Sequence, residues 1–293
     1  MRACGMLLPV SSLPSPYGIG AFSESAYRFV DTLKEAGQKY WQILPLGPTS
    51  YGDSPYQSVS TFAGNPYFID LETLIDKKLL TKEECESCDW GGSESYVDYE
   101  KMYLSRYKLL RKAYERADLK NDPDYAVFLK KEKDWLLDYC LFMAIKNAQN
   151  GKCWIDWPEE LKDRHSKAVK EAEKELAEEV GFYSFQQYCF TTQWNKLKEY
   201  ANEKGIQIIG DVPIYVALDS SDAWANPEML QFDEDYNPKA VAGCPPDAFS
   251  AIGQLWGNPL YDWKKLKKDN YGWWVQRMSH SLKLYDVVRI DHF

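Results

Sequence analysis

Met6-Leu-Leu-Pro-Val10 and Trp41-Gln-Ile-Leu-Pro-Leu46 are two short apolar stretches that predict buried strands near the start of the chain. Between them, apolar residues from Ala26 to Leu33 recur at the spacing of an amphipathic helix, and Gly37 suits a left-handed helix end. A strand, a helix and a strand in this order predict parallel pairing with a right-handed crossover. The stretch therefore indicates an α/β fold.

The same alternation returns in the second half of the chain. Residues 206–211 predict a third strand and residues 287–291 a fourth, each preceded by an amphipathic helical pattern. Long loops rich in Gly and Pro, residues 47–70 and 217–263, follow the second and third strands. This pattern predicts the first four βα units of a (β/α)8 barrel of about 250 residues or more, with its chemistry at the carboxyl ends of the strands. The alternative is an open doubly wound sheet, but no glycine-rich phosphate turn follows the first strand.

Composition divides the chain into three segments. Residues 1–70 would begin a catalytic barrel, with strands 1 and 2 and an active-site loop. Residues 71–182 are highly charged and mostly helical, and predict an insertion whose last helix ends at Gly181. Residues 183–293 would resume the barrel with strands 3 and 4 and break off at strand 4.

Charge and cysteine usage exclude several classes of function. The net charge of −9 argues against a nucleic-acid partner, and no apolar run approaches the roughly 20 residues of a membrane span. Seven scattered cysteines, an odd number, favour reduced thiols and a cytoplasmic location. The pair Cys85 and Cys88 has metal-site spacing, but no second pair completes it, and a coincidental pair on a solvated turn is the better interpretation. We expect no metal and no cofactor.

Aromatic residues are unusually abundant, with 11 Trp, 21 Tyr and 12 Phe. Packing in the core explains aromatic residues by default. Several here stand beside Gly, Pro, Asn and Asp in loop-like stretches, where stacking on sugar rings is the better explanation.

The end of the chain carries the strongest candidate site. Side chains alternate along a strand, so Arg289 and Asp291 project to the same side, roughly 6–7 Å apart along the backbone. A guanidinium there lowers the pKa of the carboxyl group and keeps it ionised, which suits a nucleophile or charge stabiliser. A structural ion pair at a strand end is the alternative. Asp211 is predicted at the same edge, after the third strand.

Eight motifs in one order resemble the 4-α-glucanotransferase family, whose members are also called amylomaltases. Each motif alone is weak, but together they are specific, and the likeness is poorest over residues 75–180. The motifs are Leu7–Leu13 with Tyr17–Gly20, Trp41–Pro48, Tyr51–Gln57, Ala63–Tyr67, Gly210–Val216, Trp224–Pro227, Gln254–Trp263 and Arg289–Phe293.

The resemblance implies a cytoplasmic enzyme that transfers α-1,4-glucan segments from maltooligosaccharide donors to glucose or glucan acceptors. It also implies a (β/α)8 barrel of the α-amylase type and a retaining mechanism with a covalent glycosyl-enzyme intermediate. Asp291 matches the family nucleophile, and Arg289 matches the arginine that orients it. Asp211 matches a carboxylate that hydrogen-bonds the sugar in the cleavage subsite.

Further binding residues follow from the same resemblance. On the donor side, Ser54 and Tyr56 match residues that line the cleft, and Tyr51 matches a remote glucan contact, though a turn role is an equal alternative.

On the acceptor side, Gln254 and Trp256 match a loop that arches over the cleft and holds the acceptor, and Phe249 lies in that loop. Ala248 stands where family members often carry a second aromatic residue, which puts stacking near the acceptor subsites in doubt.

A retaining mechanism needs two carboxyl groups about 5–5.5 Å apart, and no Glu of this sequence has a position suited to the proton donor. We therefore expect an amino-terminal portion that lacks the carboxyl-terminal half of the barrel and is inactive alone. An α-amylase-type glucan hydrolase and a non-catalytic glucan-binding half-barrel are the rival interpretations.

Overall fold

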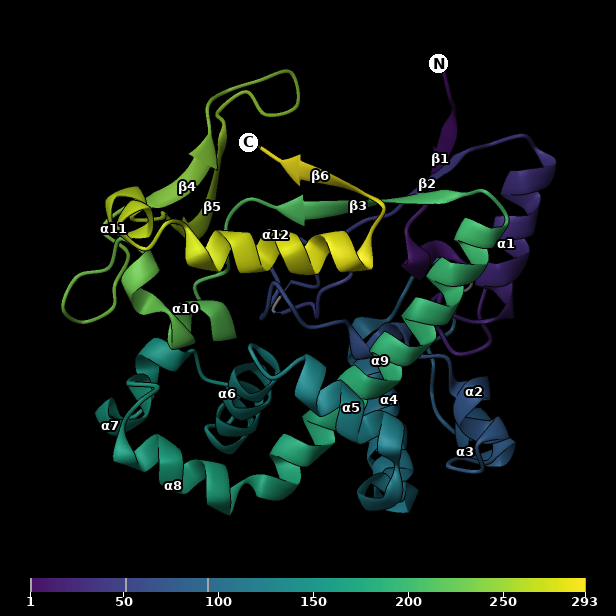
Figure 1. The fold of residues 1–293 in the computed structure, drawn as a ribbon, viewed down its shortest axis with the longest axis horizontal. Coiled ribbons are helices and arrows are strands. Elements are labelled where there is room, and N and C mark those ends of the chain that lie inside the picture. The colour runs from purple at the N-terminus through teal and green to yellow at the C-terminus, as the bar shows by residue number, and fades with distance from the viewer. Residues whose placement is uncertain (1, 51, 94, 293) are drawn as a thin grey trace.

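A four-stranded parallel sheet organises the molecule. The computed structural model describes residues 2–50, 52–93 and 95–292. The strand order is β1-β2-β3-β6, and all three neighbouring pairs are parallel. Figure 1 shows β3 and β6 side by side, with α12 running along them on one side of the sheet. The strands are β1 (Gly5–Leu7), β2 (Tyr40–Gln42), β3 (Gln207–Pro213) and β6 (Val287–Asp291).

The first two strands are shorter than predicted. β1 ends at Leu7, and a 3-10 turn over Val10–Ser12 follows Pro9. β2 covers only the first two residues of the predicted stretch 41–46. Each predicted stretch contains a proline, Pro9 or Pro45, which has no N–H to donate to a sheet ladder.

Helices cover one face of the sheet. α1 (Glu24–Glu35) and α9 (Ala177–Glu203) contact each other, and α9 and α12 (Gly272–Leu284) both contact β3. The predicted end of the first helix is confirmed: Gly37 has a φ of 70°, and the following N–H, of Gln38, donates to the carbonyl of Leu33.

The middle of the chain is helical, as predicted, but its last helix does not end at Gly181. α9 runs 27 residues, through Gly181 and across the expected boundary at residue 182. The glycine serves packing instead, since a Cβ there would lie 2.3 Å from the hydroxyl of Tyr114. The other helices here are α2 (Leu71–Asp76), α3 (Lys82–Glu86), α4 (Tyr99–Arg116), α5 (Pro123–Lys131), α6 (Leu136–Ala148), α7 (Glu159–Lys162) and α8 (Lys167–Glu175).

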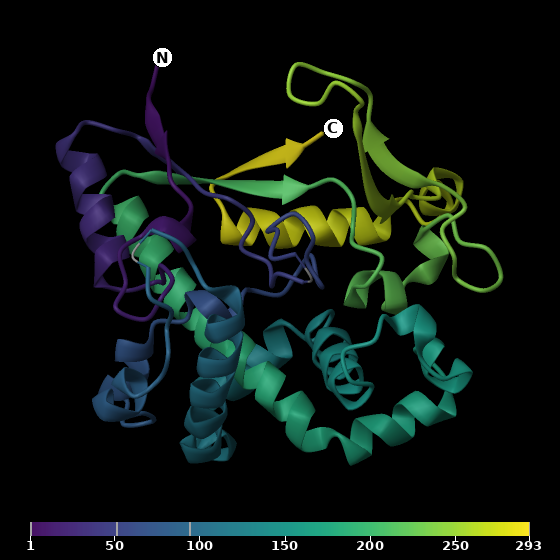
Figure 2. The same ribbon diagram turned by 180° about the vertical axis from the view of Figure 1, so that it is seen from behind.

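The segment 217–263 is not the plain loop that its Gly and Pro content predicted. It holds α10 (Ser221–Ala225) and an antiparallel hairpin of β4 (Val241–Cys244) and β5 (Gln254–Pro259). The hairpin rises beside the end of β6 in both views (Figures 1 and 2). We call residues 241–259 the arm. α11 (Trp263–Lys268) then leads to α12.

None of the helices in the described parts of the chain combines the length and the apolar character that crossing a membrane requires.

Candidate active site

A cavity of about 590 Å³ opens where β3 and β6 end. Four segments that are distant in the sequence form its walls: the loop after β2, the segment after β3, the arm, and the end of β6. Its lining residues are Ser54, Tyr56, Gln57, Pro213, Ile214, Tyr215, Gln254, Trp256, Asn258, Asp291 and His292.

Arg289 joins two carboxylates at this edge of the sheet. Its Nη1 donates to Oδ1 and Oδ2 of Asp211 at 2.8 and 2.7 Å, and its Nη2 donates to Oδ1 of Asp291 at 2.5 Å. The prediction that Arg289 and Asp291 project to the same side is confirmed. Arg289 also stands opposite Asp211 in the β3–β6 register, so the sheet itself sets this geometry.

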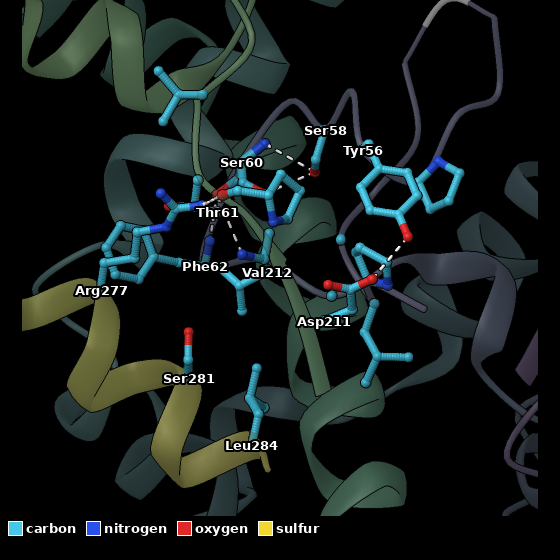
Figure 3. A pocket seen from close by; sticks show the side chains of 18 of the residues that line it. Tyr56, Ser58, Ser60, Thr61, Phe62, Asp211, Val212, Arg277, Ser281 and Leu284 are labelled. Atoms are coloured by element: carbon cyan, nitrogen blue, oxygen red, sulfur yellow. Dashed lines mark hydrogen bonds between the residues drawn. The ribbon is translucent and has the colours of Figure 1, made fainter. Parts of the chain in front are cut away.

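The two carboxylates differ in environment. Asp211 is 2% exposed and accepts a further hydrogen bond from the hydroxyl of Tyr56 at 2.7 Å (Figure 3). Asp291 lines the cavity, and its Oδ2 lies 3.5 Å from Nε2 of His292. Asp211 is thus largely occupied by protein donors, whereas Asp291 faces the space that a ligand can enter.

Charge and burial fix the protonation of the groups around Asp211. Partial burial alone would lower the pKa of Arg289, but the charges and hydrogen bonds of Asp211 and Asp291 outweigh it and raise the pKa. Burial, then the hydrogen bond to Asp211, raises the pKa of Tyr56 well above its usual value. Tyr56 therefore stays a hydrogen-bond donor and Arg289 stays a cation at any physiological pH.

Two further contacts hold the end of β3. A Cβ on Gly210 would lie 2.2 Å from the ring of buried Tyr285, so only glycine lets the strand pass this close. Arg277 of α12 is 1% exposed, and its guanidinium donates to the carbonyls of Pro213 and Ile214, just beyond Asp211. A buried arginine thus fixes the strand end through main-chain atoms.

A second, smaller hollow of about 50 Å³ lies behind the cavity, between the loop after β2 and α12. Figure 3 shows Tyr56 and Asp211 on one side of it and Arg277, Ser281 and Leu284 on the other. A volume of this size holds only a few waters. Of these two spaces, only the cavity at the ends of β3 and β6 has room for a sugar chain.

The structure brings most of the predicted residues together. Ser54, Tyr56, Gln254 and Trp256 line the cavity with Asp291, and Asp211 lies directly behind Tyr56 and Arg289.

One predicted binding residue, Phe249, stands apart from this group. Phe249 is not among the lining residues, because it sits beyond the end of β4, where it is 96% exposed. Tyr51 lies outside the described residues.

Six lining residues were missed: Gln57, Pro213, Ile214, Tyr215, Asn258 and His292. Each belongs to one of the motifs that resemble the family. The motif therefore marked the segment, but nothing in the sequence assigned a function to the individual residue. Gln57 and Asn258 pair with each other across the chain, which spacing along the sequence cannot reveal. The ring of His292 lies 4.5 Å from that of Trp256.

No group of three or more His, Cys, Asp or Glu suited to a metal is found in residues 2–50, 52–93 and 95–292. Cys85 was expected on a solvated turn, and that expectation is wrong. It is fully buried in the core, where burial raises the pKa of its thiol to about 11.

The family model described as 4-alpha-glucanotransferase matches residues 8–293, and the chain belongs to this family. A 4-alpha-glucanotransferase of Clostridium butyricum is 54% identical over 97% of this chain, and one of Streptococcus pneumoniae is 49% identical over all of it. The chain spans 58% of the length of each of these relatives. An amylomaltase from Streptococcus agalactiae, solved in complex with acarbose, superposes with a TM-score of 0.95 at 43% identity, covering 100% of this chain and 60% of that one.

Proposed function

We propose that this chain carries the nucleophile side of a retaining 4-α-glucanotransferase, which moves α-1,4-glucan segments between maltooligosaccharides. The observation that carries the proposal is the carboxylate of Asp291, held by Arg289 at the wall of a cavity of about 590 Å³. Family membership and the acarbose-bound structural relative support a glucan as the ligand.

In this mechanism the carboxylate of Asp291 attacks the anomeric carbon of the donor and displaces the leaving glucan oxygen, which takes a proton. A covalent glycosyl ester results, and a 4-hydroxyl of the acceptor then displaces the carboxylate, giving its proton to the group that had protonated the leaving oxygen, with overall retention. Arg289 orients the attacking carboxylate through its hydrogen bond to Oδ1 of Asp291.

Asp211 is proposed to hold the sugar in the cleavage subsite. An ionised carboxylate offers about four acceptor positions, and Asp211 uses three of them for Arg289 and Tyr56. One position is left for a sugar hydroxyl. Ser54 and Tyr56 would then contact the donor side of the chain, and we also retain Tyr51 as a proposed remote contact.

The proton donor is proposed to lie in the part of the relatives' length that this chain does not span. Within the described residues, Asp291 is the only carboxylate among those that line the cavity. Asp211 accepts its hydrogen bonds from Tyr56 and Arg289 and does not line the cavity, so it is not placed to protonate the leaving oxygen. On this proposal residues 1–293 would not complete the reaction alone.

The same reasoning extends to the fold. We propose that β1, β2, β3 and β6 are the first four strands of a (β/α)8 barrel. Residues 1–70 would begin this barrel, 71–182 would be the helical insertion, and 183–293 would resume it. The parallel order and the site at the carboxyl ends of the strands support this assignment.

Transfer competes with hydrolysis because water and a sugar hydroxyl attack the same intermediate. We propose that Gln254 and Trp256 line the acceptor subsites, raise the effective concentration of the sugar and limit water. Phe249 would contribute only if the arm bends toward a bound acceptor.

The test is incubation with maltotriose of the full-length protein, by which we mean residues 1–293 together with the part of the relatives' length that they do not span. Glucose together with chains longer than maltotriose supports the proposal. Exclusively shorter products would indicate an α-amylase-type hydrolase. Maltooligosaccharide binding by calorimetry without turnover would indicate a non-catalytic glucan-binding protein.

A further inference from the structure

The side chains of Gln57 and Asn258 form an amide pair at the wall of the cavity. Nε2 of Gln57 donates to Oδ1 of Asn258 at 2.8 Å, and Nδ2 of Asn258 lies 3.4 Å from Oε1 of Gln57. Gln57 also donates to the main-chain carbonyl of Trp256 at 3.3 Å, and Asn258 donates to the carbonyl of Val216 at 2.9 Å. The pair therefore ties together the loop after β2, the segment after β3, and the arm.

The arm has few other attachments. In the described part of the chain, Gln57 is the only hydrogen-bond partner that residues 241–257 have outside the arm. The tip is solvent-exposed, with Phe249 at 96%, Ile252 at 93% and Leu255 at 78%. Asn258, by contrast, is 5% exposed. The hydrogen bonds that attach the arm to the rest of the chain are thus at its base, and they are made by the side chains of two neutral amides, Gln57 and Asn258.

Each amide in the pair both donates and accepts, so the loss of one side leaves buried polar atoms of the other without a partner. Trp256 is the lining residue that the pair fixes through the main chain, and its own Nε1–H is turned toward Gln254 within the arm. The position of Trp256 over the cavity consequently depends on Gln57 as well as on the contact of its ring with His292.

We infer that Gln57 and Asn258 are positioning residues that couple the donor side of the cavity to the acceptor arm. The inference rests on the proposed function for its catalytic consequence. Gln57 neighbours Tyr56, which bonds Asp211, so a single loop presents one residue to the cleavage subsite and the next to the arm. The pair acts through Trp256 and sets how well an acceptor outcompetes water.

The central variant is Gln57→Met, which keeps the length of the side chain, adds no charge and removes its three side-chain hydrogen bonds. Gln231→Met is the matched control, because Gln231 likewise donates from its side chain to a main-chain carbonyl, that of Tyr261, and does not line the cavity. The paired exchange of Gln57→Asn with Asn258→Gln tests rescue, since it conserves the summed length of the two amides.

Two readouts separate this inference from the proposed function. The first is hydrogen–deuterium exchange of peptides within residues 241–257, which needs no catalysis. Because the hydrogen bond from Gln57 to the carbonyl of Trp256 is lost, we expect exchange in Gln57→Met to be about fivefold faster. The Gln231→Met control and peptides of α12 should match the wild type. Unchanged exchange in the arm would overturn the inference, whatever the protein does with glucans.

The second readout is the partition of products from maltotriose in the full-length protein. We expect Gln57→Met to raise KM for the acceptor about fivefold while total donor cleavage stays within about twofold, and the paired exchange to recover part of the loss. Equal losses of transfer and hydrolysis, with no recovery, would mean a merely structural role. If the wild type transfers no glucan, the proposed function fails, and the exchange experiment still decides the inference.

Discussion

The tips of β3 and β6 and the arm face the same cavity, but they are built in opposite ways. At the strand tips, the sheet register places the charged groups opposite each other, and hydrogen bonds from one arginine hold both carboxylates in position. In the arm, the side chains beyond the base are exposed, and a neutral amide pair provides the attachment.

The difference separates two tasks. Bond breaking needs reacting groups held in place before the substrate arrives, which a sheet provides and a mobile loop does not. Choosing between acceptors of different lengths needs a surface that can adapt. On this account the tips set whether the donor is cleaved, and the arm sets where the cleaved segment goes.

The largest effect is expected at the strand tip, from Asp291→Asn. The amide oxygen can still accept from Arg289 but cannot attack the anomeric carbon, so glucan transfer should fall by about 10⁴-fold or more in the full-length protein. Thermal unfolding should be unchanged, because the side chain is a near-isostere. Activity within tenfold of the wild type would remove Asp291 from the nucleophile role.

Arg289→Met should have the next largest effect. It removes the group that orients Asp291 and leaves buried Asp211 with only the hydroxyl of Tyr56, so transfer should fall by about 10²- to 10³-fold. The free energy of unfolding should also fall, by about 1–3 kcal/mol, since a buried carboxylate loses its cation. Urea titration alongside the assay checks both. A loss of stability without a loss of turnover would make the arginine a structural ion-pair partner.

In the arm, Trp256→Ala should change the ratio of transfer to hydrolysis and should leave cleavage of the donor nearly unchanged. Transfer to added glucose should fall by about tenfold while hydrolysis of the donor changes much less, because the acceptor subsite loses its platform. Product analysis with and without added glucose measures the ratio. Equal losses of both rates would mean that Trp256 supports cleavage, as the strand tips do, and would contradict the division of tasks between the tips and the arm.

The smallest effect is expected at the arm's tip. Phe249 is 96% exposed and does not line the cavity, so Phe249→Ala should change stability by less than about 0.5 kcal/mol. It should alter transfer from short donors by less than about twofold. A loss of transfer as large as that of Trp256→Ala would show that the arm closes on the acceptor.

The comparison also explains what the sequence could predict. Strands β3 and β6 and the same-side placement of Arg289 and Asp291 follow from period-two alternation, which is a local property. The contact between Arg289 and Asp211 depends on β3–β6 register, across 78 residues, and no local pattern encodes it.

The arm lay inside a segment predicted to be a loop. Its hairpin depends on two glycines with positive φ: Gly253 (75°) in the turn before β5, and Gly257 (79°) at the register shift within β5. The single amide pair at its base joins residues about 200 positions apart. The continuation of α9 through Gly181 was missed for a related reason, since that glycine makes room for Tyr114 on another helix. The spacing of apolar residues along the sequence identifies helices and strands, whereas tertiary contacts decide where each of them begins and ends.

The most direct test of the central claim is the identity of the residue that becomes glycosylated. The full-length protein would be mixed with an α-maltosyl fluoride blocked at its non-reducing 4-hydroxyl, quenched in acid and mapped by peptide mass spectrometry. Fluoride leaves without a proton donor, and the blocked sugar cannot serve as an acceptor, so the ester accumulates. We predict a maltosyl adduct on Asp291 that is absent from Asp291→Asn. An adduct on Asp211 or elsewhere, or complete release of fluoride with no adduct at all, would contradict the account.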